Sequence, residues 1–135
     1  MTGLSSAMEK MGVNWAFLTS TVLDLIQSHT VPSLRTLCIG GEQIRTSQVK
    51  EWSKVVHLRQ TYGSSEISGV ISSQRLTKVS TVRDVGKANT GIYWITDPTD
   101  TNRLAPVGAI GEVLVEGYIA AVSYTHLTLP TILRV

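Results

Sequence analysis

The sequence predicts an α/β fold, a partial parallel sheet with crossover helices that is followed by antiparallel β strands. Short apolar runs alternate with helical patterns as far as Val70, which is typical of parallel strands joined by helices. Beyond Val70, β-prone segments and turn residues replace the helical patterns. The change falls between Gln74 and Asp84, so we expect an α/β unit over residues 1–75 and a β unit over residues 76–120.

The first unit opens with a predicted helix, a strand and a second helix. Residues 5–11 predict a short helix, and residues 15–18 form an apolar run that suits a buried strand. Thr21 and Asp24 have capping-box spacing, which predicts the start of the second helix. Its apolar face would hold Val22, Leu25 and Ile26, and Pro32 follows its expected end.

Two further predicted strands of this unit each lead into a loop that is a candidate for ligand binding. Residues 34–39 are mostly apolar and end at a pair of glycines, as a parallel strand that enters a tight loop would. Thr46 or Ser47 can cap the next helix, and a strand over residues 57–61 follows it. Ligands bind open parallel sheets outside the carboxyl ends of the strands. The loops 40–43 and 62–66 therefore form the candidate site.

The second unit has the sequence pattern of β-strands and turns. Residues 79–85 and 92–95 are β-prone, and the segment 97–100 predicts a turn. Residues 112–117 alternate like a strand, with Val113 and Val115 on one face. We expect antiparallel β structure here.

Composition excludes several classes of function. The chain has 135 residues and a net charge of +2 from singly scattered charges, so neither a nucleic acid nor a membrane surface is an expected partner. A lone cysteine, Cys38, allows no internal disulfide and no cysteine-based zinc site. No signal peptide and no apolar run of about 18 residues is visible, so we expect a cytoplasmic protein.

The segment from Gln60 to Glu66 has the chemistry of a nucleotide site. It combines an aromatic ring for a base, a glycine, two hydroxyls for phosphate oxygens and a carboxylate for a divalent cation. The chain contains no G-x-x-x-x-G-K-[ST] phosphate loop and no G-x-S-x-G hydrolase elbow. The alternative to a nucleotide site is a structural turn with a packed tyrosine and no ligand-binding role.

The residues Tyr62-Gly63-Ser64-Ser65-Glu66 resemble the Y-G-x-x-E signature of adenylate-forming enzymes, particularly adenylation domains of fungal-type nonribosomal peptide synthetases. Further segments resemble that family in the same order and at the same spacing. These segments are residues 17–21, 37–42, 84–87, 94–98 and 104–112. The resemblance implies the large domain of such an enzyme, in which the second unit is part of a distorted β-barrel.

The resemblance implies a nucleotide-binding role for both loops. Tyr62 would stack on adenine, with Gly40, Gly41 and Glu42 on the other side of the base. Thr61 and Gly63 would flank the base and the sugar. Ser65 would donate to a phosphate oxygen, and Glu66, the catalytic and metal-binding candidate, would hold Mg²⁺ against the phosphates of ATP.

The resemblance also implies a substrate pocket formed by small or apolar residues, namely Phe17, Cys38, Gly40, Thr61, Gly69 and Val70. This wall favours an uncharged amino acid or another small carboxylate. The implied reaction forms an acyl adenylate and passes the acyl group to the phosphopantetheine thiol of a carrier domain. Carrier and condensation domains would be the partners within the parent chain.

Several segments that the family requires are not in this sequence. These are the upstream phosphate loop, the pocket aspartate, the R-T-G-D-like segment and the domain with the catalytic lysine. We therefore expect an inactive internal fragment. Residues 121–135 resemble a translated sequencing adapter and are expected to be a non-native tail. Two alternatives stay open, a related carboxylate-CoA ligase fragment and a non-catalytic nucleotide-binding or interaction fragment.

Overall fold

The computed structural model describes residues 3–64, 69–78 and 80–116. The predicted tail over residues 121–135 lies outside this range, and the account of it stays a prediction. The elements along the chain are α1 (Gly3–Lys10), β1 (Trp15–Leu18), α2 (Ser20–Leu23), the 3-10 helix η1 (Ser28–Thr30), β2 (Thr36–Ile39), α3 (Thr46–Trp52), β3 (His57–Ser64), β4 (Gly69–Arg75), β5 (Lys87–Ala88), β6 (Ile92–Asp97), β7 (Asp100–Leu104) and β8 (Glu112–Glu116).

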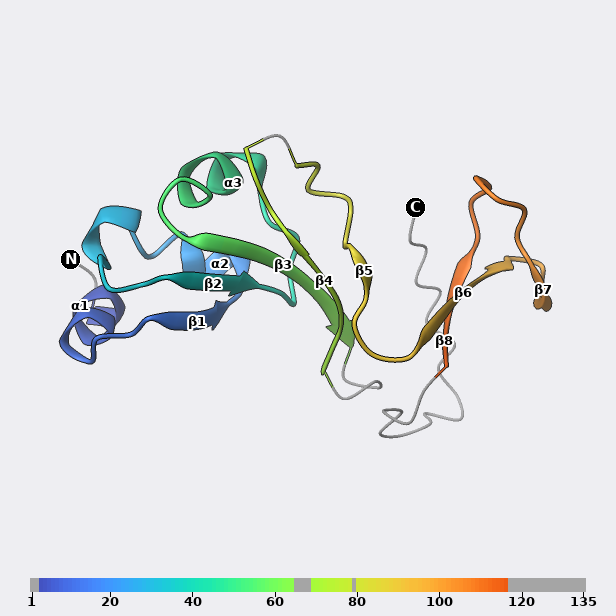
Figure 1. The fold of residues 1–135 in the computed structure, drawn as a ribbon, viewed down its shortest axis with the longest axis horizontal. Helices are drawn as coiled ribbons and strands as arrows, with labels where there is room; N and C mark the ends of the chain where they lie inside the picture. Colours follow the sequence, from blue (N-terminus) through green and yellow to red (C-terminus); the bar gives the residue numbers. More distant parts are fainter. Residues whose placement is uncertain (1–2, 65–68, 79, 117–135) are drawn as a thin grey trace.

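The described strands form two sheets, which confirms the predicted fold class (Figure 1). In the first sheet the order is β1-β2-β3-β4-β5, with β1, β2 and β3 parallel and β4 and β5 antiparallel to their neighbours. The second sheet has the order β7-β6-β8 and is antiparallel throughout. Strand β5 belongs to the first sheet, so the hydrogen bonds of that sheet extend past residue 75. The division into units at residues 75 and 76 stays a prediction.

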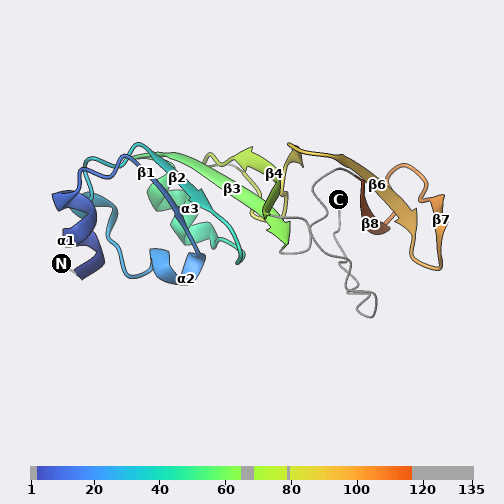
Figure 2. The same ribbon diagram turned by 90° about the horizontal axis from the view of Figure 1, so that it is seen from below.

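The hydrophobic core lies on one face of the parallel strands. Leu37, Ile39 and Leu58 point to that face and are fully buried, and Trp52 of α3 packs in the same cluster. Leu23 at the end of α2 joins them. Figure 2 shows α2 and α3 on the same side of β1, β2 and β3. Among the described elements no helix covers the opposite face, where the side chain of Trp15 is 55% exposed.

Helix α2 begins earlier than the sequence predicts. Thr19 is its N-cap, with the side chain accepting a hydrogen bond from the Val22 amide at 3.3 Å, so the capping-box prediction at Thr21 is wrong. The helix also ends at Leu23. Ile26 is buried as predicted, whereas Leu25, expected on the same apolar face, is 56% exposed.

Helix α3 also differs from its prediction at the first turn. Thr46 and Ser47 both lie within the helix, so neither of the two predicted residues is the cap. The N-cap is Arg45, whose backbone amide donates to Oε1 of Gln48 at 3.0 Å. Gln48, three residues after the cap, thus provides the acceptor for the backbone amide of the cap residue.

The predicted β-prone segment 79–85 forms no strand in its described part, residues 80–85. Side chains hold this backbone instead, because Gln60 Nε2 donates to the Val82 carbonyl at 3.2 Å and Ser72 Oγ donates to the Val85 carbonyl at 3.0 Å. The turn between β6 and β7 lies where residues 97–100 predict it. The alternation of β8 is also confirmed, since Val113 and Val115 are half-buried.

Candidate nucleotide and substrate site

Strand register places the substrate-pocket candidates on the open face of the first sheet. Phe17, Cys38 and Arg59 are partners across β1, β2 and β3. Side chains two residues apart on a strand share a face, so Thr61 lies on this face as well. Gln60 points to the helix-covered face, where it is buried. The parallel strands therefore present two different surfaces next to the same loops.

Three pocket candidates converge at the end of β2. A Cβ atom added to Gly40 would lie 2.3 Å from Oγ1 of Thr61 and 2.7 Å from Cζ of Phe17. Thr61 Oγ1 is fixed in this position because it donates to the Ile39 carbonyl at 3.0 Å. Only glycine fits between these side chains, so the glycine predicted at this point has a steric cause.

Gly69 and Val70 lie at the start of β4, opposite the end of β3. Gly63 pairs with Val70, and Ser64 pairs with Gly69. A Cβ on Gly63 would lie 1.7 Å from the Gly69 carbonyl oxygen, so the two backbones approach too closely for a side chain. Val70 is 39% exposed. These two candidates therefore flank Gly63, beyond the row that contains Phe17.

A groove of about 630 Å³ opens at the carboxyl ends of β2 and β3. It is a size that holds a small ligand. The structure brings five of the predicted nucleotide-binding residues to its wall, and Gly40 is adjacent to them in the chain. The groove is lined by Gly41, Glu42, Gln43, Gln60, Thr61, Tyr62, Gly63, Val82, Arg83 and Val85.

Gln60 and the segment 82–85 also line this groove, and neither was among the predicted site residues. Gln60 is only 6% exposed and uses its Nε2 to hold the Val82 carbonyl. Its Oε1 has no hydrogen-bond partner among the described residues. A buried acceptor without a partner is unusual. This oxygen is buried from solvent, so the structure does not present it to a ligand in the groove. Its place two residues before Tyr62 on one strand was the only signal in the sequence.

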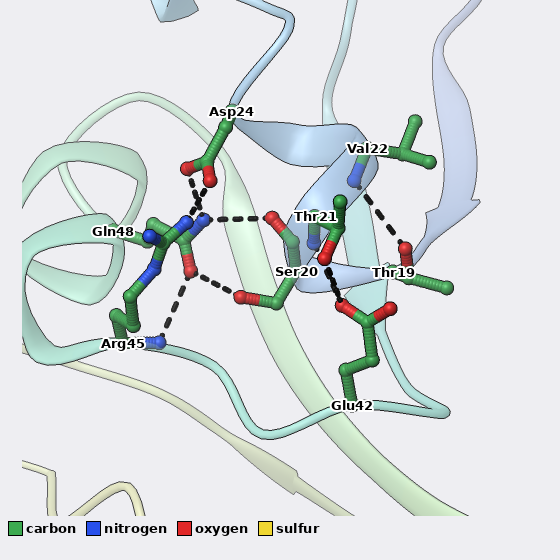
Figure 3. Close-up of polar contacts among 8 residues, drawn as sticks. All are labelled: Thr19, Ser20, Thr21, Val22, Asp24, Glu42, Arg45 and Gln48. Atoms are coloured by element: carbon green, nitrogen blue, oxygen red, sulfur yellow. Dashed lines mark hydrogen bonds and ion pairs between the residues drawn. The ribbon is translucent and has the colours of Figure 1, made fainter.

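The loop after β2 is tied to the start of α2 through Glu42 (Figure 3). Its Oε2 accepts hydrogen bonds from the amide and from Oγ1 of Thr21, each at 2.8 Å. These bonds hold the pKa of the Glu42 carboxyl below its ordinary value. Gly41, one residue earlier, has a positive φ of 77°. The side chain of Glu42 thus anchors the loop, and Glu42 is also one of the residues that line the groove.

Gln48 of α3 joins the same loop region to α2 (Figure 3). Its Oε1 accepts from Ser20 Oγ at 2.8 Å and from the Arg45 amide, while its Nε2 donates to the Ser20 carbonyl at 2.9 Å and to Asp24 Oδ1 at 2.7 Å. Arg45 forms an ion pair with Asp24 and lowers the pKa of that carboxyl. A buried amide with every bonding position used fixes α2 against α3.

Ser65 and Glu66, the predicted phosphate and metal contacts, lie outside the described residues. Among the residues that the structure does describe, no group of three or more His, Cys, Asp or Glu side chains is placed to hold a metal ion. The roles of Ser65 and Glu66 stay predictions.

None of the helices in the described ranges is long and apolar enough to cross a membrane.

Comparison with known proteins gives the family. A sequence model described as AMP-binding enzyme matches residues 2–125. The chain belongs to the AMP-binding enzyme family. Over 93% of its length it is 40% identical to the FR901469 synthetase of Dothideomycetidae sp.. Over 90% of its length it is 38% identical to nonribosomal peptide synthetase 4 of Gibberella zeae. The chain spans only 1% and 2% of the length of these two proteins.

Two solved structures have the same fold as this chain. The chain superimposes with a TM-score of 0.74 on PA1221, a nonribosomal peptide synthetase protein with adenylation and PCP domains, at 22% identity. The TM-score is 0.75 for the N-terminal subdomain of NpsA from Klebsiella oxytoca, at 15% identity. The likeness covers 95% of this chain in both cases, but 28% and 33% of those chains.

Proposed function

We propose that this chain is the nucleotide-binding part of an adenylation domain of a nonribosomal peptide synthetase, which activates an amino acid or another small carboxylate with ATP. The observation that carries the proposal is the groove that Glu42 and Tyr62 share. The family membership and the similarity to two synthetases support it.

The adenine ring would lie in this groove between Tyr62 and the backbone of Gly41 and Glu42. An aromatic side chain offers a stacking surface to any base. The fit is supported by the size of the groove and by the residues that line it.

The acyl substrate would lie on the open face, against Phe17, Cys38 and Thr61. Gly40 lies where the nucleotide side and this face meet, so the reacting groups would come together at the end of β2. A carboxylate oxygen of the substrate would form a bond to the α-phosphorus of ATP, and the bond from that phosphorus to the bridging oxygen would break. Pyrophosphate would leave, and an acyl adenylate would remain. Positioning and charge neutralisation suffice for such a step, so no nucleophilic side chain is required.

Mg²⁺ would be held by Glu66, and it would neutralise charge on the phosphates. Ser65 would donate to a phosphate oxygen. In the parent protein, the thiol of a phosphopantetheine group on a carrier domain would attack the acyl carbon and release AMP.

ATP–pyrophosphate exchange tests this function. The complete adenylation domain that carries this sequence should catalyse exchange with at least one amino acid or small carboxylate, and Glu66→Ala should abolish it. The 135-residue chain alone should show none, because it lacks the segments that the reaction requires. Exchange by the short chain that Glu66→Ala abolishes would contradict the fragment proposal. A complete domain without exchange for any carboxylate would contradict the function.

A further inference from the structure

Arg59 introduces a positive charge to the open face of the first sheet. Strand register places it in one row with Cys38 and Phe17, and Thr61 is the next residue of β3 on the same face. Its side chain is partly buried, whereas a solvated surface arginine would be exposed. The residues assigned to the substrate pocket therefore have a guanidinium beside them.

The charge of Arg59 is not neutralised within the described part of the chain. Its guanidinium donates one hydrogen bond, to Ser73 Oγ at 2.8 Å. The single ion pair among the described residues joins Arg45 and Asp24 and does not involve Arg59. A guanidinium has five N–H donors, so most of them stay free for a ligand.

The neighbours of Arg59 on this face increase the positive charge. Arg75 is its partner on β4, and Lys87 of β5 pairs with Ser73. The positive charge of Arg59 also acts on Cys38, where it opposes the rise of the thiol pKa that burial causes. Arg59 and Cys38 are thus neighbours in space as well as in register.

We propose that Arg59 selects the substrate, and that it binds a carboxylate on the substrate side chain. The inference rests on the proposed function, and it changes the expectation of an uncharged substrate, which took no account of Arg59. A planar guanidinium binds a carboxylate through two parallel hydrogen bonds. Partial burial strengthens such a pair, because water screens it less. Arg75 is exposed and serves as a matched control on the same face.

Amino-acid-dependent ATP–pyrophosphate exchange by the complete domain tests the inference. Wild-type enzyme should have a higher kcat/KM for glutamate, aspartate or a longer acidic homologue than for glutamine, leucine or valine. Arg59→Met should raise KM for the acidic substrate about 10- to 100-fold, which is the effect of losing a charged hydrogen bond. Arg59→Lys should retain part of the preference, and Arg75→Met should change it far less than Arg59→Met does.

Three results would overturn the inference, and each has a different meaning. Preference for a neutral substrate that Arg59→Met does not alter means that the function holds and Arg59 has no role in selection. An equal loss for every substrate means that Arg59 supports the pocket without touching the side chain. Absence of exchange with every substrate contradicts the proposed function itself. Thermal unfolding of each variant separates these results from loss of the fold.

Discussion

Oε2 of Glu42 lies 2.8 Å from both the amide nitrogen and the Oγ1 atom of Thr21. This contact joins the loop that follows β2 to the first turn of α2, across 21 positions in the sequence. It means that the groove wall is positioned by a carboxylate that does not itself need to touch the nucleotide.

The Glu42 contact should depend on pH in a defined direction. Because the pKa of Glu42 is lowered in the fold, its contribution to stability is fully present above the ordinary value of 4.5 and is lost as the pH falls through the lower folded value. Glu42→Gln should therefore lower Tm at pH 7, and the difference from wild type should shrink on acidification below pH 4.5. Thermal unfolding followed by circular dichroism from pH 7 to pH 3 measures it. A difference that stays constant over this range would contradict the role of the charge.

Gln48 should be a strong determinant of stability. Gln48→Met has a similar volume but leaves Ser20 and the Arg45 amide without their partner. The expected loss is about 1–3 kcal/mol of unfolding free energy, which is the range for a buried polar group left unsatisfied. Urea denaturation measures the loss. Gln27→Met, at an exposed position, is the control and should change stability little. Equal effects of the two substitutions would show that the four hydrogen bonds of Gln48 contribute nothing.

Gly40 should reject any side chain. The added methyl group of Gly40→Ala would lie 2.3 Å from Thr61 Oγ1 and should destabilise the fold by about 1–3 kcal/mol through overpacking. Gly40→Ala combined with Thr61→Ala should recover part of this loss, because the closest contact is removed. Gly3→Ala is the control, since nothing lies within 4 Å of its added Cβ. If the double variant is no more stable than the sum of the single effects, the contact is not the cause.

Cys38 should react slowly with alkylating reagents. Burial raises the pKa of its thiol, so the reactive thiolate is scarce at neutral pH. Arg59 acts in the opposite direction, and Arg59→Met should therefore move the alkylation pH profile to higher pH. Iodoacetamide labelling between pH 7 and pH 10, read by mass spectrometry, measures both effects. A profile that does not move in Arg59→Met would show that the two side chains do not interact.

The sequence predicted the elements that local patterns determine. The apolar run at Trp15–Leu18 is β1 with the same bounds, and the suspected loop 40–43 follows the carboxyl end of β2. The second suspected loop, residues 62–66, differs from its prediction. Strand β3 continues through Tyr62 to Ser64 and pairs there with β4. Pairing with β4 keeps residues 62–64 in the strand, and the pattern of a single strand does not reveal that partner.

The parts that the sequence did not predict depend on contacts between distant segments. Thr21 and Asp24 have the spacing of a capping box, but Thr19 caps the helix while Thr21 binds Glu42. The segment near Val82 forms no strand, and side chains of β3 and β4 donate hydrogen bonds to its carbonyls. Such contacts between distant segments cannot be read from residue spacing.

The binding of ATP to the complete domain tests the central claim, that the groove of Glu42 and Tyr62 holds adenine. Titration calorimetry with a non-hydrolysable ATP analogue should give Tyr62→Ala an affinity about 10- to 100-fold below wild type, because the base loses its stacking partner. Tyr62→Phe should bind nearly as well as wild type. Equal affinity of wild type and Tyr62→Ala, with both proteins folded, would contradict the claim.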